Sequence, residues 1–149
     1  MNRLTRTTLF AITTTIGLLA ADGFARGEPI PRPEHPRPDF QREAWANLNG
    51  TWAFRFDPEN QGVAQQWFAG NAKFDRSIVV PFCWESSLSG VEDTSGQQVG
   101  WYRRQVRVPE AWQGKQVWLC FGAVDWQCRV WVDGQEVGRH TGGYTPFEF

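Results

Sequence analysis

The sequence predicts an all-β protein, an antiparallel sandwich of about seven short strands, because turn residues and large apolar residues both abound. Among its 149 residues are 15 Gly and 9 Pro, which favour frequent turns. The chain also carries 11 Phe, 9 Trp and 2 Tyr, side chains that require a core. Short stretches in which apolar and polar residues alternate recur between the turns, a period typical of strands. This composition excludes a disordered chain and fits a coiled coil poorly.

Residues 1–25 have the layout of a secretory signal peptide. Arg3 and Arg6 form a short positive region, and the 13-residue apolar run Leu9–Ala21 follows it. Residues 23–25 then supply the small side chains that a signal peptidase reads. We therefore expect cleavage and a secreted or periplasmic protein; the alternative is an uncleaved amphipathic leader. The run is too short to cross about 30 Å of hydrocarbon, so no stable membrane anchor is expected.

Residues 26–39 are rich in proline, with five prolines in fourteen positions. Such a segment is extended and forms no hydrogen-bonded ladder of its own. We expect an N-terminal arm that lies across the domain; the alternatives are a linker or a ligand for a proline-binding protein. The sandwich itself is assigned to residues 40–149.

The first half of the sandwich contains two expected strands separated by a turn and a short helix. Trp52, Phe54 and Phe56 alternate with smaller or polar residues, which is the period of a strand. The apolar run 78–80 is expected to be a buried strand that ends at Pro81, because proline has no N–H to donate. The other expected elements, in chain order, are a turn at 57–60, a helix at 63–69 and a polar loop at 86–100.

The second half contains the clearer strand signals. Expected strands cover residues 102–108, 116–121 and 126–132, and a further strand begins at Gln135. Arg104 falls on the apolar face of the first of these strands and therefore needs a hydrogen-bond partner or an edge position. Asp133-Gly134 stands between two strand-like stretches and predicts a two-residue hairpin turn, which needs positive φ at both central residues.

Nine tryptophans suit either a core or carbohydrate recognition, because aromatic faces stack on the C–H faces of sugar rings. Trp131 points away from the face formed by Val130 and Val132, and we expect it to be the least core-like. Four others stand where a core needs them: Trp52, Trp67, Trp84 and Trp101.

The three cysteines, Cys83, Cys120 and Cys128, leave at least one thiol without a partner in the chain. Cys120 and Cys128 lie on neighbouring expected strands and are candidates for a disulfide; free thiols are the alternative. The cysteine spacings match no zinc pattern, and only His35 and His140 are available to assist. We expect neither a metal nor a cofactor.

Catalytic patterns are weak throughout the sequence. Most carboxylates have a turn role, and no pattern brings together the three that remain, Glu85, Asp125 and Glu148. Neither a G-x-S-x-G elbow nor a phosphate-binding glycine loop is present. The formal net charge of −1 argues against a nucleic-acid ligand, because no basic excess exists to release counterions. Carbohydrate recognition is the remaining activity that the composition favours.

Three stretches of the sequence form a specific combination: PRPEHPRPDFQREAWANLNGTWAFRFD (31–57), IVVPFCWESSLSGV (78–91) and the whole of residues 100–149. The last contains a Trp-Tyr-Arg-Arg strand, a Val-Trp-Val-Asp-Gly hairpin and the ending Gly-Gly-Tyr-Thr-Pro-Phe-Glu-Phe. Together they resemble the N-terminal sugar-binding domain of glycoside hydrolase family 2, which includes β-galactosidases and β-glucuronidases.

The resemblance implies a galactose-binding-like jelly roll that packs against downstream immunoglobulin-like and TIM-barrel domains. In the family, the barrel carries both catalytic glutamates, and the acid/base lies in an Asn-Glu dipeptide. This sequence has no Asn-Glu dipeptide, so no catalytic residue carries over and the chain alone is expected to be inactive. Because family members continue with further strands, we expect the jelly roll to be incomplete at its C-terminus.

The main expectation is therefore the non-catalytic N-terminal domain of a secreted family 2 enzyme that hydrolyses β-glycosides. A free-standing carbohydrate-binding module is the alternative, and a truncated or split reading frame is the third hypothesis. The scaffold serves readers of galactose, glucuronic acid, mannose and arabinose, so the sequence does not select a sugar. The residues expected to contact carbohydrate or the barrel are Asp125, Trp126, His140 and Tyr144.

Overall fold

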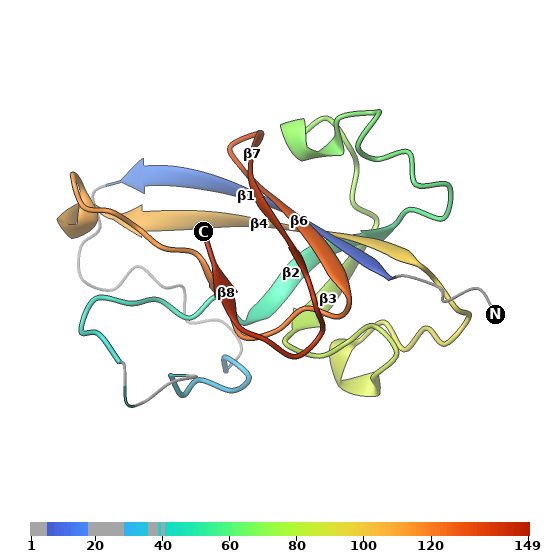
Figure 1. Cartoon of the computed structure of the whole chain (residues 1–149), viewed down its shortest axis with the longest axis horizontal. Coiled ribbons are helices and arrows are strands. Elements are labelled where there is room, and N and C mark those ends of the chain that lie inside the picture. The colour runs from blue at the N-terminus through green and yellow to red at the C-terminus, as the bar shows by residue number, and fades with distance from the viewer. Residues whose placement is uncertain (1–5, 18–28, 36–38, 40) are drawn as a thin grey trace.

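A six-stranded sheet forms the body of the computed structural model, which describes residues 6–17, 29–35, 39 and 41–149 (Figure 1). Helical structure in these ranges is limited to 3-10 turns, and no helix there is long and apolar enough to cross a bilayer. The prediction of an all-β fold is confirmed. In spatial order the strands are β3 (Arg76–Val80), β2 (Gly50–Phe56), β4 (Val99–Pro109), β1 (Thr7–Gly17), β6 (Gln127–Val132) and β7 (Gln135–Thr141).

A second, smaller sheet pairs β5 (Cys120–Phe121) with β8 (Phe147–Glu148) in antiparallel fashion. Next to this pair, the backbones of Leu119 and Phe149 exchange two hydrogen bonds of 2.9 and 3.0 Å. The 3-10 turns are η2 (Trp67–Ala69), η3 (Ser87–Ser89) and η4 (Glu110–Trp112).

β1 lies at the centre of the large sheet and runs parallel to both neighbours, whereas the other described strand pairs are antiparallel. The residues from Leu9 to Ile12 are at most 6 % exposed. The sequence placed this segment in a leader outside a sandwich of residues 40–149. The structure instead makes it the central strand, so the sheet is mixed rather than purely antiparallel. The other residues of the expected leader, 1–5 and 18–25, lie outside the described residues.

One face of the sheet is covered by the small β5–β8 sheet. Phe10 packs its ring against Trp52, Tyr102 and Phe121, at centroid distances of 5.8, 5.1 and 5.0 Å. Phe121 also stacks on Phe147 of β8 at 4.8 Å. Strands from the first and last thirds of the chain therefore share one apolar cluster.

The opposite face is covered by the segment 63–74, and this corrects the expectation for Trp131. Trp131 is only 2 % exposed. Its ring stacks on Phe68 at 5.2 Å and on Trp101 at 5.3 Å, with interplanar angles of 3° and 24°. The expectation is wrong because it assumed that one face of the strand is exposed to solvent. The four tryptophans expected in the core are all buried, at 6 % exposure or less.

A buried carboxylate fixes the turn that begins this covering segment. Asp57 is 2 % exposed and accepts hydrogen bonds from the backbone N–H groups of Gln61 and Gly62, each at 2.8 Å. It also accepts from Trp101 Nε1 at 3.1 Å. Three donors thus satisfy a carboxylate, a group whose burial without partners costs far more than that of a neutral amide or hydroxyl. The expected turn at 57–60 is confirmed by the bond from Asn60 N to Asp57 O.

Local signals also predicted three other features correctly. β3 ends at Val80, directly before Pro81. Arg104 has the partners that its position required, since its Nη1 donates to the carbonyls of Leu48 and Asn49 at 2.7 and 3.1 Å. Asp133 and Gly134 form the β6–β7 hairpin turn with φ of 49° and 79°.

Two expected elements are shorter in the structure. The helix expected at 63–69 is a series of turns that ends in the 3-10 turn η2. The strand expected at 116–121 is reduced to β5, and Val117, expected on its inner face, is 49 % exposed. Both segments pack on the large sheet instead of joining it. Their sequence pattern alone therefore does not determine their backbone conformation.

The proline-rich arm contacts the chain just before β2. Asn49 Nδ2 donates to the carbonyls of Pro31 and Arg32 at 3.1 and 3.3 Å, and Asn47 Nδ2 donates to Arg32 O at 3.0 Å. The ring of His35 meets Trp45 edge to face at 4.7 Å. The described part of the arm therefore lies across the domain.

The disulfide considered between Cys120 and Cys128 is not formed, and all three cysteines are free. Cys120 is exposed, with its Sγ 3.7 Å from Glu148 Oε2. Cys128 instead points into the apolar cluster and is 1 % exposed. The two side chains therefore lie in different environments.

Candidate functional site

The four predicted site residues lie where β6 begins and where the chain leaves β7. β6 and β7 pair so that Gln127 is opposite Thr141 and Cys128 is opposite His140. This register brings the Asp125-Trp126 turn beside the loop that carries Tyr144. The hairpin at Asp133-Gly134 thus places residues almost 20 positions apart at one end of the sheet.

Hydrogen bonds join the two loops directly. Gly142 N donates to Trp126 O at 2.7 Å. His140 Nε2 lies 3.1 Å from Gly142 O and 3.3 Å from Thr145 Oγ1. The His140 ring also stacks on Phe147 at 4.0 Å, with an angle of 13° between the planes. His140 therefore holds the loop in place, and its ring nitrogen Nε2 is already occupied.

The Gly142-Gly143 pair forms the bend that these contacts require. Gly142 has a φ of +133°, a conformation that L side chains rarely adopt. At Gly143, an added Cβ would lie 2.7 Å from Asp125 Oδ1. The carboxylate of Asp125 is therefore packed against the backbone of the loop that leads to Tyr144.

Two aromatic side chains remain open to solvent at this end of the sheet. Trp126 is 43 % exposed and Tyr144 is 95 % exposed. Asp125 is also exposed, and its carboxylate lies against Gly143, the residue before Tyr144. Exposed aromatic faces and a carboxylate that accepts hydroxyl donors are the groups that a sugar ring needs. We refer to Asp125, Trp126 and Tyr144 as the loop cluster.

Thr145 and Phe147 are part of this arrangement, and sequence reasoning gave neither of them a role. Thr145 reaches His140 Nε2, and Phe147 covers the His140 ring. Contacts between residues five and seven positions apart across a bend leave no periodic pattern. The motif ending Gly-Gly-Tyr-Thr-Pro-Phe was the one signal that included them.

The family model described as "Glycosyl hydrolases family 2, sugar binding domain" matches residues 45–149. The chain belongs to glycosyl hydrolase family 2. The resemblance found in the motifs is thereby confirmed, and the loop cluster lies inside the matched domain.

Curated relatives of the family 2 domain include β-glucuronidases and a β-galactosidase. The protein from Paenibacillus borealis is 31 % identical over 115 residues, which cover 76 % of this chain and 19 % of that protein. The protein from Felis catus is 34 % identical over 123 residues, with the same coverage of 76 % and 19 %. The chain therefore spans about a fifth of the length of these relatives.

Solved structures give the same result. A β-glucuronidase from an uncultured Clostridium has a TM-score of 0.56 and 31 % identity, and the match covers 68 % of this chain and 18 % of that one. The Ruminococcus gnavus β-glucuronidase in complex with D-glucuronic acid has a TM-score of 0.55 and 29 % identity, with coverages of 68 % and 18 %.

The three carboxylates left open by the sequence have separate surroundings. Glu85 Oε1 forms an ion pair with Arg6 Nη1 at 2.5 Å, and Glu148 lies beside Cys120. Asp125 lies against Gly143. In the described part of the chain, no three His, Cys, Asp or Glu side chains gather where a metal ion would fit.

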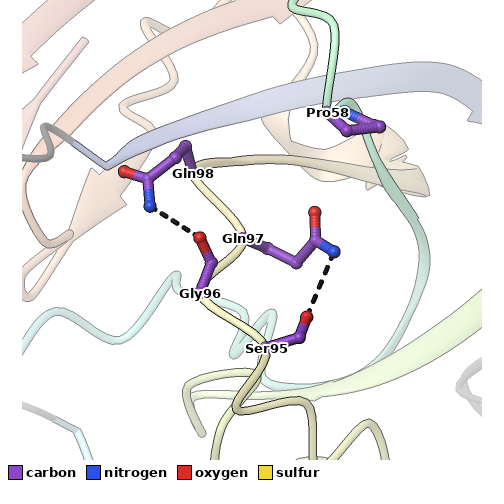
Figure 2. A pocket seen from close by; sticks show the side chains of 5 residues that line it. All are labelled: Pro58, Ser95, Gly96, Gln97 and Gln98. Atoms are coloured by element: carbon purple, nitrogen blue, oxygen red, sulfur yellow. Dashed lines mark hydrogen bonds between the residues drawn. The ribbon is translucent and has the colours of Figure 1, made fainter.

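A hollow of about 150 Å³ is lined by Pro58 and residues 95–98, and none of the four predicted site residues is among them. Figure 2 shows how these lining residues lie. Gln98 Nε2 donates to Gly96 O at 2.6 Å, and Gln97 Nε2 donates to Ser95 Oγ at 3.2 Å. Gln98 Oε1 is buried and finds no donor among the described residues. The side chains drawn there are bonded mainly to one another, so the loop cluster is the stronger candidate site.

Proposed function

We propose that this family 2 domain is the non-catalytic N-terminal part of a β-glucuronidase-type enzyme, and that its loop cluster contacts carbohydrate. The observation that carries the proposal is the match over residues 45–149 to enzymes of which the chain spans about a fifth. In such an enzyme, immunoglobulin-like and TIM-barrel domains are the proposed partners, and the barrel supplies the two carboxylates of retaining glycoside hydrolysis.

The proposed ligand is a uronic acid or a glycoside of one. The relatives matched over 76 % of the chain include β-glucuronidases by name, and one matched structure contains D-glucuronic acid, whereas a β-galactosidase matches over 34 % of the chain. Trp126 supplies an aromatic face for the apolar side of the ring. Asp125 accepts hydrogen bonds from ring hydroxyls, and Tyr144 supplies a second contact through its exposed side chain.

We also propose that residues 1–25 direct export, so that the enzyme works in the periplasm or outside the cell. The support is the order of a positive region, an apolar run and small residues along the sequence. N-terminal sequencing of the protein recovered from the culture medium or periplasm tests this, with a mature terminus at Arg26 expected.

Two measurements test the proposed division of labour. The chain is expected to release no nitrophenol from nitrophenyl β-D-glucuronide; turnover that a carboxylate substitution within the chain abolishes would overturn the non-catalytic assignment. In calorimetric titration with D-glucuronic acid, Trp126→Ala is expected to lower affinity by about 3- to 10-fold, the scale of one stacking contact. Trp118→Ala is the matched control, since Trp118 is 45 % exposed but lies outside the cluster.

The alternative is a free-standing carbohydrate-binding module. The 95 % exposure of Tyr144 favours it, because an exposed aromatic ring is available to a ligand without any further domain. Titration against a panel of neutral and acidic oligosaccharides decides between the two. Tight binding of an oligosaccharide by the chain alone supports the module, and heat only with monosaccharide uronates supports the enzyme domain.

A further inference from the structure

The apolar segment at the start of the chain carries two assignments that cannot hold at the same time. As a leader, the run Leu9–Ala21 must be exposed to an export machinery or a membrane. As β1, residues 7–17 fill the space between β4 and β6. Residues 9–17 are therefore assigned both to an exposed leader and to the interior of a sheet.

In the folded domain, the first half of β1 is paired along both of its edges. It pairs with β4 from Thr7 to Gly17 and with β6 from Thr7 to Ile12. The first residue of β1 makes a further backbone hydrogen bond, in which Thr7 N donates to Gln98 O at 2.8 Å. No strand edge of this stretch is left for another chain to pair with.

Both faces of β1 are covered as well. Leu9 is 1 % exposed and lies in the cluster of Trp101 and Trp131. Phe10 and Ile12 are 6 % and 4 % exposed and lie in the opposite cluster. The residues that would form the start of an apolar leader core are thus removed from solvent on both sides.

Contacts of polar groups fasten β1 to the rest of the domain just before its start and again at Ile12 and Thr14. Arg6 forms the ion pair with Glu85 and lies 5.7 Å from the centre of the Trp84 ring. At the other end, Thr14 N donates to Asp133 Oδ1 at 2.7 Å, and Asp133 N donates to Ile12 O at 2.8 Å. Both Arg6, the positive residue nearest the apolar run, and the run itself are therefore bonded to other parts of the domain.

We infer that residues 6–17 occupy either the sheet or the export machinery, so that folding of the full-length chain withholds its own leader. The inference rests on the proposed export role of residues 1–25. An export machinery takes up a leader as an extended, accessible segment, whereas residues 9–12 of β1 are paired along both edges and covered on both faces. Export and cleavage then require that β1 leave the sheet.

Hydrogen exchange followed by mass spectrometry tests the first half of the inference on the purified full-length chain. The amides of residues 7–12 are expected to exchange as slowly as those of Trp101–Val106 in β4, because both are central strands. Exchange of residues 7–12 at the rate of an unstructured peptide, with β4 protected, would overturn the inference.

Cleavage by bacterial signal peptidase I in detergent micelles tests the second half. The chain diluted from urea directly into the reaction is expected to be cut at least about tenfold faster than the refolded chain, because local opening limits the folded form. Equal rates would overturn the inference alone. Absence of cleavage in both forms would overturn the export proposal and the inference with it, while protected amides would still establish β1.

A pair of variants separates opening of β1 from general loss of stability. Glu85→Gln combined with Asp133→Gly removes the ion pair of Arg6 and the bond from Thr14 to the Asp133 side chain, and glycine keeps the positive φ of the hairpin turn. The folded double variant is expected to be cut several-fold faster than wild type. Glu136→Gln is the matched control, since Glu136 pairs with Arg129 and Arg139 on the same hairpin. A double variant cut no faster than the control would contradict the inference.

Discussion

At the scale of single residues, Gly62 shows how closely the second apolar cluster is packed. The backbone N–H of Gly62 donates to the buried carboxylate of Asp57. A Cβ added at Gly62 would lie 2.4 Å from Trp101 Nε1 and 2.7 Å from the Trp67 ring. Neither indole can withdraw easily, because Trp101 is fully buried and bonded to the same carboxylate.

Gly62→Ala is therefore expected to lower the free energy of unfolding by about 1–3 kcal/mol, the usual cost of overpacking a filled core. Urea unfolding followed by tryptophan fluorescence measures this difference. Gly122→Ala is the control, since nothing lies within 4 Å of a Cβ at that position. Equal stability of the two variants would show that the indoles have room to move.

The cysteines allow a second prediction at this scale. Burial raises the pKa of the Cys128 thiol to about 11, and the side chain is 1 % exposed. Burial and the nearby Glu148 carboxylate also raise the pKa of the exposed Cys120 thiol. At pH 8, a thiol reagent is expected to label Cys83 and Cys120 in the native protein, and Cys128 only after unfolding.

Glu148→Gln sharpens this test. Loss of the carboxylate lowers the pKa of Cys120, so the thiolate fraction at pH 8 and the labelling rate both rise. The rate at Cys83 is the internal control, because the change at Glu148 leaves its surroundings intact. Rapid native labelling at all three sites, followed by peptide mapping, would contradict the burial of Cys128.

At the scale of elements, the β6–β7 hairpin carries a compact ion-pair group. Glu136 accepts hydrogen bonds from Arg129, on the opposite strand, and from Arg139, on its own strand. These bonds lower the pKa of Glu136 from its ordinary value of 4.5 to about 2. Because the folded-state pKa lies below the unfolded value, the group stabilises the hairpin at neutral pH.

Glu136→Gln is expected to be less stable than the wild type above about pH 4.5, and this difference is expected to vanish as the pH falls to about 2. The difference at neutral pH is expected to stay below about 1 kcal/mol, since solvent and salt screen the pair. Thermal unfolding across this pH range measures it. A difference that grows on acidification would contradict the assignment.

The elements that local signals predicted are those whose neighbours are close in sequence. The Asp133-Gly134 hairpin and the end of β3 at Pro81 follow from residues a few positions apart. The need for a partner at Arg104 follows from the strand period, although its partners, Leu48 and Asn49, lie 56 and 55 positions away. The hairpin also explains why the four site residues, although found through a motif, come together in space. Their polar contacts through Thr145 and Phe147 had no such signal.

The features missed from sequence depend on segments that are distant along the chain. Trp131 is buried by residues 63–74, which lie more than fifty positions before it. β1 pairs in parallel with β4 across about ninety positions, and parallel strands have no hairpin turn to announce them. An apolar run that fits both a leader and a buried strand cannot be assigned by its composition alone.

At the scale of the whole molecule, β1 joins two groups of strands into one sheet. The pairs β2–β3 and β2–β4 lie on one side of it, and the β6–β7 hairpin lies on the other (Figure 1). Phe10 of β1 contacts the rings of Trp52, Tyr102 and Phe121, which belong to three different strands of the two sheets. Removal of this ring therefore affects every layer on that face.

Phe10→Ala is expected to lower the free energy of unfolding by about 3–5 kcal/mol, the range for loss of a buried phenylalanine. That is a large part of the roughly 5–15 kcal/mol that stabilises a domain, so the thermal midpoint falls steeply. Thr13→Ala is the control on the same strand, since Thr13 is exposed. Circular dichroism melts that coincide for the two variants would contradict the burial of Phe10, because loss of a ring outside the core leaves no cavity.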